Sequence, residues 1–422
     1  MKKTILKNAI ILVTLPVAGL FLMLIAHLLP VDKMKSNVAS SADTITKEFE
    51  DSLVIDGYNA TLTGNFTDSL MLEFAIYDSP HSVIEQIMHM YRGESNNADE
   101  WWPGVSLVDY LNGKEQKEVE YSRYWHGYLV ILKPLLMFLS FNSVRLLNSV
   151  LQLSLLAICL IALSNKGYSK IAISLAVSMP FMFFFSSFAS LSLSICIYLL
   201  LLEMLLIAFF FEKFKKDEGF ITFFILFGSA TAFFDFLTYP VVTLAIPMCA
   251  FLAFKEEDIL NNNLLIILKY SLSWGIGYLF MWASKWIIAT IFPKNNTITD
   301  ALNTVSLRTS DAPDSGRIKS YFECLKLNLS PFANRAFACA FVLILIYIVV
   351  NLIVQYKNKK QISFERAIPV LVIALIPFAW WFVCLNHSSE HWMFTCRNFS
   401  IFVFAVMCAF SSCTKKNIEK TE

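Results

Sequence analysis

Apolar residues in this chain gather into long runs separated by short polar segments. The first run covers about residues 8–29 and follows Lys2, Lys3 and Lys7. As a helix it is long enough to span about 30 Å of hydrocarbon, which predicts a first membrane helix. A cleaved signal peptide is the alternative, although its apolar core is normally shorter, about 7 to 15 residues.

Nine further runs are long enough, or nearly long enough, to cross a bilayer as helices. They lie at about residues 144–163, 171–185, 193–211, 221–234, 241–254, 264–291, 336–356, 367–385 and 399–410. Together with the first run, they predict an all-α integral membrane protein with about ten transmembrane helices.

The basic residues predict the orientation of these helices. The segments on one side collect Lys166, Lys170, Lys213, Lys215, Lys216, Lys255, Lys357, Lys359, Lys360, Arg366, Lys415 and Lys416. The opposite turns, near 186–192 and 235–240, carry no lysine or arginine. By the positive-inside rule, both termini are therefore predicted to be cytoplasmic in a multi-pass protein of the cell membrane.

This topology divides the chain into predicted units. Residues 1–30 form the first membrane helix, and 31–125 form a large extracytoplasmic loop. Residues 126–413 form the multispanning domain with an outer loop at 293–335, and 414–422 form a cytoplasmic tail. Within the large loop we expect interfacial helices, among them an amphipathic helix over 75–90.

Composition supports the membrane assignment and argues against a nucleic-acid partner. Hydrophobic residues make up 56% of the chain, more than a soluble core of this size needs. The net charge is +1 and no basic run stands outside the membrane flanks, so no nucleic-acid partner is expected. The nine cysteines mostly lie within apolar runs without regular spacing, which favours a role as buried filler. The predicted topology also places all six histidines at or beyond the outer face, which locates the polar chemistry there.

Asp68 is the first candidate for catalysis. It follows the polar stretch from Asp56 and precedes an abruptly apolar segment, so its carboxylate could act as a general base at the membrane edge. Alternatively, Asp68 caps a helix that begins at Ser69. Asp56 is the reserve candidate for the base.

A group of cations follows the large loop. Arg123, Tyr124, His126 and Lys133 lead into apolar sequence at the predicted outer surface. Arginine and lysine in such a group could bind a phosphate. The alternative is an interfacial belt in which both side chains reach toward lipid headgroups.

Two later candidates interrupt apolar sequence. Asp235 lies in a very short turn among aromatic residues, and Pro240 follows it. Burial would raise the pKa of Asp235 unless a cation or hydrogen-bond donor compensates. Lys285 lies near the outer end of the next long helix and could pair with a carboxylate or a phosphate. A purely structural ion pair explains both residues equally well.

The last candidate group surrounds the sequence His387-x-x-Glu390-His391, followed by Arg397. This spacing occurs in one class of zinc peptidases. A further carboxylate ligand is needed downstream, and only Glu419 and Glu422 remain, in the predicted cytoplasmic tail. No metal is therefore indicated. We expect these histidines and Arg397 to bind a phosphate or diphosphate group.

The order of segments resembles the GT-C class of membrane glycosyltransferases, of bacterial type. A first membrane helix, a large outer loop with an acidic residue and many following spans carry the resemblance, which covers the topology of the whole chain. It implies transfer of a sugar from a polyprenyl-phosphate donor to a hydroxyl of a glycan or lipid-linked acceptor, with inversion, at the outer face of the cell membrane. Modification of cell-envelope polysaccharide is the expected context.

The resemblance implies roles for the candidate residues. Asp68 would be the general base, although it lies further from the first helix than is common in that class, which keeps Asp56 in reserve. The leaving phosphate would be stabilised by Arg123, His126, Lys285, His387, His391 and Arg397. Tyr124, Lys133 and Asp235 are the remaining candidates for substrate binding, and no cofactor is indicated.

Two other function classes remain open from the sequence. A polysaccharide polymerase or ligase would use the same lipid-linked donors. A transporter or flippase for an anionic lipid or solute would show charges near the middle of the membrane. Glu203 is one of few residues of this kind.

Overall fold

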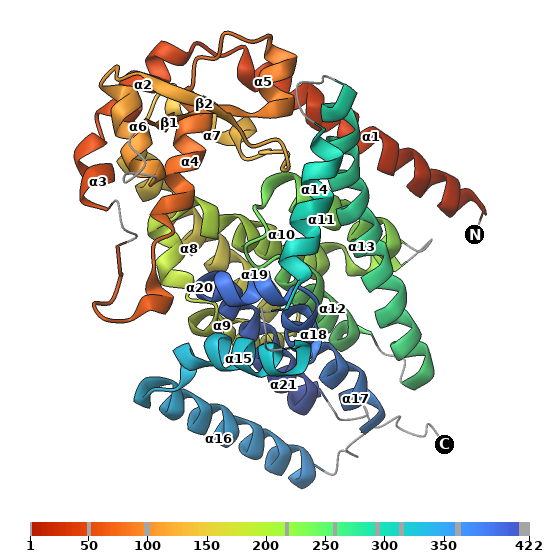
Figure 1. The fold of residues 1–422 in the computed structure, drawn as a ribbon. Coiled ribbons are helices and arrows are strands. Elements are labelled where there is room, and N and C mark those ends of the chain that lie inside the picture. Colours follow the sequence, from red (N-terminus) through yellow and green to blue (C-terminus); the bar gives the residue numbers. More distant parts are fainter. Residues whose placement is uncertain are drawn as a thin grey trace.

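The computed structural model describes residues 2–48, 52–96, 102–215, 219–255, 260–291, 296–311, 316–358 and 364–412. The predicted cytoplasmic tail at 414–422 lies outside these residues. The described chain is predominantly helical, and its helices form a bundle with a smaller N-terminal lobe at one end (Figure 1).

Seven helical segments of the described chain are long and apolar enough to cross a membrane. They are Thr4–His27, Phe141–Asn165, Leu191–Lys215, Asn262–Ile291, Arg335–Lys357, Arg366–Val383 and Trp392–Ser411. Three of the predicted spans form shorter apolar helices, Ser169–Phe181, Gly219–Phe234 and Val242–Phe254. The structure thus supports a multi-pass membrane protein with seven full-length candidate spans, fewer than the ten predicted.

The helices of the bundle follow in chain order. They are α1 (Lys2–His27), α7 (Leu129–Leu136), α8 (Phe141–Asn165), α9 (Ser169–Phe181), α10 (Leu191–Lys215), α11 (Gly219–Phe234), α12 (Val242–Phe254), α13 (Leu260–Ile291), α14 (Thr297–Thr309), α15 (Arg317–Leu329), α16 (Arg335–Lys357), α17 (Phe364–Ile373), α18 (Ile376–Val383), α19 (Leu385–Glu390), α20 (Trp392–Thr395) and α21 (Phe399–Ser412). Short 3₁₀ segments lie at Phe184–Ala189, Ser330–Phe332 and Cys396–Asn398.

Close backbone approach joins α11 to α13. A Cβ atom at Gly228 would lie 2.1 Å from the carbonyl oxygen of Trp274, and one at Gly277 would lie 2.2 Å from that of Ile225. Only glycine fits at these two positions. Small residues that let helices approach closely are typical of membrane bundles, where dispersion rather than the hydrophobic effect holds helices together.

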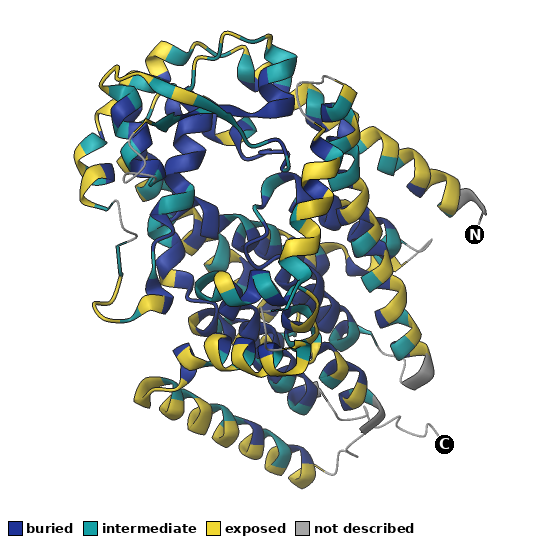
Figure 2. Ribbon diagram, in the orientation of Figure 1, coloured by how far each residue is buried: buried dark blue, intermediate teal, exposed yellow. Residues whose placement is uncertain are grey.

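Exposure separates the centre of the bundle from its periphery (Figure 2). The centre is buried, whereas α1 and α16 are largely exposed along their apolar lengths. Exposed apolar side chains on a membrane helix face lipid at no cost. Six of the eight described cysteines are buried free thiols, as expected for filler: Cys159, Cys196, Cys249, Cys324, Cys396 and Cys408.

The N-terminal lobe consists of the described residues between 31 and 121. Its helices are α2 (Val31–Ala39), α3 (Ala42–Lys47), α4 (Asn65–Ile76), α5 (Val83–His89) and α6 (Pro103–Leu111), with a 3₁₀ turn at Asn59–Thr61. Strands β1 (Tyr91–Ser95) and β2 (Gln116–Glu120) pair antiparallel, from Tyr91 opposite Glu120 to Ser95 opposite Gln116. This two-stranded ribbon was not predicted.

The predicted amphipathic helix over 75–90 is wrong. Helix α4 ends at Ile76 and α5 begins at Val83, so the chain leaves the helix between them. The Ser82 hydroxyl and the Glu85 side chain form a capping box that starts the second helix. The polar segment from Asp78 to Ser82, which contains Pro80, separates the two helices and explains the failed prediction.

Candidate functional site

Four parts of the chain bring a group of polar side chains together, which we call the polar cluster: Tyr124, Asp235, Arg308, His387 and His391. Asp235 follows α11 in a tight turn, as predicted. Its carboxylate accepts hydrogen bonds from the Thr238 amide at 2.9 Å and the Thr238 hydroxyl at 2.5 Å. Leu237 has a left-handed φ of 68°, an uncommon conformation for a side chain of this size.

His387 of α19 holds this turn in place. Its Nε2 donates to the Leu237 carbonyl oxygen at 2.8 Å, and the residue is 4% exposed. Burial lowers the pKa of His387 to about 3. At neutral pH the imidazole is therefore uncharged, and its Nδ1 is an acceptor.

His391 and Arg308 extend the cluster to α14. Arg308 Nη1 lies 2.8 Å from His391 Nε2, and the rings of His387 and His391 are 4.9 Å apart. Because the guanidinium only donates, Nε2 of His391 is the acceptor. Burial, with a smaller effect of Arg308, lowers the pKa of His391 to about 4. The cluster thus contains one guanidinium beside two neutral imidazoles.

Tyr124 and Asp235 complete the cluster. The Tyr124 ring packs against Phe236 and Trp282, with centroids 5.7 and 5.8 Å apart. Burial raises the pKa of Tyr124 and raises that of Asp235 to about 6, although hydrogen bonds from Thr238 oppose the shift at Asp235. Asp235 is consequently ionised at neutral pH but close to its titration range.

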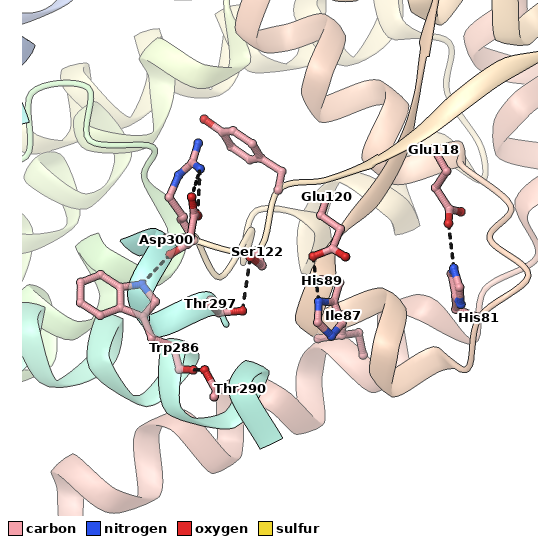
Figure 3. A network of polar contacts seen from close by, with 12 residues as sticks. His81, Ile87, His89, Glu118, Glu120, Ser122, Trp286, Thr290, Thr297 and Asp300 are labelled. Atoms are coloured by element: carbon pink, nitrogen blue, oxygen red, sulfur yellow. Dashed lines mark hydrogen bonds and ion pairs between the residues drawn. The ribbon is translucent and has the colours of Figure 1, made fainter. Parts of the chain in front are cut away.

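Arg123 lies beside the cluster but already has a counter-ion. Its guanidinium is 3.0 Å from the carboxylate of Asp300 on α14, and its carbonyl oxygen accepts from Trp286 Nε1 at 3.0 Å (Figure 3). Ser122 and Thr297 lie within 3.5 Å of each other in the same contact. These bonds attach α13 and α14 to the segment that carries Tyr124.

Polar atoms without a hydrogen-bond partner gather around the cluster. Among the described residues these include Tyr278 Oη, Trp282 Nε1, Arg308 Nε and His387 Nδ1, all buried. The Tyr278 and Trp282 rings are 5.1 Å apart, and Trp282 contacts Tyr124. Buried polar atoms normally have partners, so several unpaired ones in one place indicate a binding site. Three donors and one acceptor suit an oxygen-rich ligand such as a phosphorylated sugar.

An apolar groove of about 460 Å³ lies between α4, α7, α8 and α10. Its wall is almost entirely apolar, with Tyr128, Asn148, Ser194 and Tyr198 as the main polar contributors. Phe234, the last residue of α11, also lines it. Asp235 of the polar cluster is the next residue in the chain, although no residue of the cluster itself lines the groove.

Asp68 occupies a different place from the polar cluster. It is fully buried, and its carboxylate accepts hydrogen bonds from the amides of Leu191 at 2.6 Å and Ser192 at 2.9 Å, and from the Ser190 hydroxyl at 3.4 Å. Burial raises its pKa to about 6, while these amides lower it. The predicted cap on a helix starting at Ser69 is wrong, because α4 begins at Asn65. Asp68 caps the start of α10 instead.

Lys133 and Lys285 bind the C-terminal ends of two lobe helices. Lys133 Nζ donates to the Ala75 carbonyl in the last turn of α4 at 2.8 Å, and Lys285 Nζ donates to the Ile87 carbonyl in the last turn of α5 at 2.6 Å. Both lysines are buried, and burial lowers the pKa of Lys133 to about 8. They attach the N-terminal lobe to the bundle.

The remaining predicted residues bond elsewhere. His126 Nε2 donates to the Tyr121 carbonyl at 2.9 Å and its Nδ1 lies 3.0 Å from Tyr128 Oη. Arg397 is fully buried and donates to Ser186 Oγ at 2.8 Å and to the carbonyl oxygen of Met393. Asp56 is exposed in a turn. None of these hydrogen bonds joins the polar cluster.

The histidines of the lobe pair with carboxylates of β2. His81 lies 2.7 Å from Glu118, and His89 lies 3.1 Å from Glu120 (Figure 3). No three histidine, cysteine, aspartate or glutamate side chains within the described residues are arranged to hold a metal ion. In the His387-x-x-Glu390-His391 sequence, Arg308 beside His391 would repel a cation and Glu390 is exposed.

Sequence reasoning missed Arg308, Tyr278 and Trp282. Tyr278 and Trp282 belong to an aromatic series at four-residue spacing, Trp274, Tyr278, Trp282 and Trp286, which places them on one face of α13. That spacing was a usable signal. Arg308 has no local motif, and only the packing of α14 against α13 and α19 brings it to the cluster.

Comparison with protein-family models, with curated proteins and with solved structures finds no match to this chain.

Proposed function

We propose that the protein is a membrane glycosyltransferase of the GT-C kind, which moves a sugar from a polyprenyl-phosphate donor to an acceptor hydroxyl. One observation carries the proposal: a residue that lines the apolar groove is followed directly in the chain by a residue of the polar cluster. Phe234 lines the groove, and Asp235 lies in the polar cluster. A substrate that is half hydrocarbon and half sugar phosphate matches this pairing.

The groove would take the lipid part of the donor. Two of its walls, α8 and α10, are candidate membrane spans, so a hydrocarbon chain could enter from the bilayer. Apolar surface that the hydrocarbon chain buries there contributes about 25 cal/mol per Å² of binding free energy relative to water. The few polar atoms at Asn148, Ser194 and Tyr198 already bond to one another and leave the chain contact apolar.

The polar cluster would hold the phosphate and the sugar. Arg308 supplies the positive charge, and Tyr278 and Trp282 supply further donors for phosphate oxygens as charge develops on the leaving group. His387 Nδ1 could accept from a sugar hydroxyl. In this proposal, the cluster faces outward and both termini are cytoplasmic.

Asp235 replaces Asp68 as the proposed general base. Its carboxylate would take the proton of the acceptor hydroxyl while that oxygen bonds to the anomeric carbon. The bond from the anomeric carbon to the phosphate oxygen breaks, and its electron pair leaves with the phosphate. A pKa of about 6 suits a base at neutral pH. Asp68 lies outside the polar cluster, at the start of α10.

The test is a transfer assay in membranes with radiolabelled polyprenyl-phosphate sugars. Asp235→Asn should lower transfer by about 10²- to 10⁴-fold, because an amide cannot take the proton. The amide oxygen can still accept from Thr238, which preserves the turn. Asp56→Asn, at an exposed position, is the matched control and should retain full activity.

Full transfer by Asp235→Asn would exclude Asp235 as the base. A polymerase or ligase would show the same Asp235 dependence with a growing glycan as the product. Movement of the labelled lipid across reconstituted vesicles without sugar transfer would instead identify a flippase.

A further inference from the structure

Glu203 lies at the centre of a candidate membrane span. Helix α10 begins twelve residues before it at Leu191 and ends twelve residues after it at Lys215. At a rise of about 1.5 Å per residue, the carboxyl group is about 18 Å from either end. Glu203 is fully buried, whereas its neighbour Leu202 is 44% exposed, so Glu203 faces the interior of the bundle.

The carboxyl group has no polar partner. Neither oxygen of Glu203 has a hydrogen-bond partner among the described residues, and no described cation forms an ion pair with it. The residues on the same helix face, Cys196, Leu200 and Ile207, are all buried. Polar side chains near the start of α10 differ, since Asn148 and Gln152 of α8 both bond to Ser194.

The free-energy cost of burial decides whether a buried carboxyl group is protonated. An ionised carboxylate without a partner in an apolar environment costs far more than the neutral acid, which leaves an O–H donor and a carbonyl acceptor unsatisfied but carries no charge. A residue that carries even this smaller cost at the middle of a membrane is a candidate functional residue by default.

We propose that Glu203 is a proton-binding site at the centre of the membrane, a carboxylic acid that holds its proton in the folded protein. It lies on the face of α10 that leads to the candidate site. Cys196, seven residues earlier, contacts Thr238 Oγ1 at 3.6 Å, and Thr238 bonds to Asp235. The acid is thus about 10 Å deeper in the bundle than that contact. The inference does not depend on sugar transfer.

A lipid-soluble carbodiimide tests the proposal in the intact protein. The carboxyl proton passes to a carbodiimide nitrogen while the carboxylate oxygen bonds to the central carbon. An acyl shift from oxygen to nitrogen then gives a stable N-acylurea that contains all atoms of both reactants. We expect dicyclohexylcarbodiimide, added to membranes that contain the full chain, to label α10 at Glu203, with peptide mass spectrometry as the readout.

The same helix provides a matched control. Glu212 is exposed near the end of α10 and should stay unlabelled. Glu203→Gln should lose the label, and Glu212→Gln should retain it. Absence of label at Glu203 in the wild-type protein, or equal labelling of Glu212, would overturn the proposal.

A second measurement detects the protonated acid directly, without a labelling reagent. The infrared carbonyl band of a protonated carboxylic acid should be present in the wild-type protein and weakened in Glu203→Gln, but unchanged in Glu212→Gln. An unchanged band in Glu203→Gln would also overturn the proposal. Neither readout uses a sugar donor, so failure of the proposed transferase activity would leave both results interpretable.

Discussion

Two sets of polar side chains behave differently in this protein. Asp68, Lys133 and Lys285, at the contact of the N-terminal lobe with the bundle, bond to backbone groups at helix ends. At the polar cluster, Arg308 and His387 keep polar atoms without a partner. Every charged group of the first set has a hydrogen-bond partner in the fold. The second set keeps atoms without one.

The signs of the charges explain the first set. The start of a helix presents unpaired amides with partial positive charge, and its end presents unpaired carbonyls with partial negative charge. Asp68 lies at the start of α10, and the two lysines lie at the ends of α4 and α5. Each charge thus meets the helix end that stabilises it. We infer a structural role for these three residues and a binding role for the cluster.

The largest expected effect separates the two sets by activity. Arg308→Gln should lower kcat/KM for sugar transfer by about 100- to 1000-fold, because a donor to the developing phosphate charge is lost. The thermal unfolding midpoint in detergent should change little. Arg317→Gln is the matched control, since Arg317 belongs to the next helix and pairs with Asp311. Unchanged transfer by Arg308→Gln would remove the cluster from phosphate binding.

The second largest expected effect is a loss of stability in the first set. Asp68→Ala should lower the free energy of unfolding by about 2–3 kcal/mol, because the amides of Leu191 and Ser192 are left buried without an acceptor. Thermal or denaturant unfolding in detergent measures this loss, and Asp56→Ala at an exposed position is the control. A large loss of activity at unchanged stability would return Asp68 to the mechanism.

The smallest effect is a pH dependence at the cluster. The pKa of His387 falls from 6.5 to about 3 on folding, so the folded state resists protonation. The stability that depends on the neutral ring is complete above pH 6.5 and is lost as the pH falls toward 3, by at most about 1.4 kcal/mol per pH unit.

Unfolding midpoints at a series of pH values measure this loss. His387→Gln retains an amide donor for the Leu237 carbonyl but does not titrate, so its stability should fall less steeply with acid than that of the wild type. Ser389→Ala, on the same helix, should keep the wild-type slope. Equal slopes for all three proteins would show that His387 does not change its pKa on folding.

Much of the local structure followed from the sequence. Long apolar runs predicted the helices of the bundle because burying a backbone in lipid requires that its hydrogen bonds close within each segment. The same reasoning overcounted the spans, since the runs at 171–185, 221–234 and 241–254 form helices of only 13 to 16 residues. The turn at Asp235 was predicted, whereas the break between α4 and α5 was not.

The composition of the polar cluster was predicted only in part. Asp235, His387, His391 and Tyr124 were recognised as residues that interrupt apolar sequence, but so were Asp68, Lys133 and Lys285, which bond to helix ends. The two groups have the same local signature, a charged or polar residue at the edge of an apolar segment. Sequence alone could not separate them, because the distinction lies in what each side chain meets.

By itself, the sequence determined that the protein is helical and crosses the membrane several times. It also determined which polar residues lie at the edge of apolar segments. Both depend on local hydrophobicity and on the length of each apolar run. The tertiary structure decided which of those polar side chains have hydrogen-bond partners. Asp68 meets the amides of a helix 123 and 124 residues away, and Arg308 reaches His391 across 83 residues. Contacts over such distances depend on how helices pack, which no local pattern of residues records.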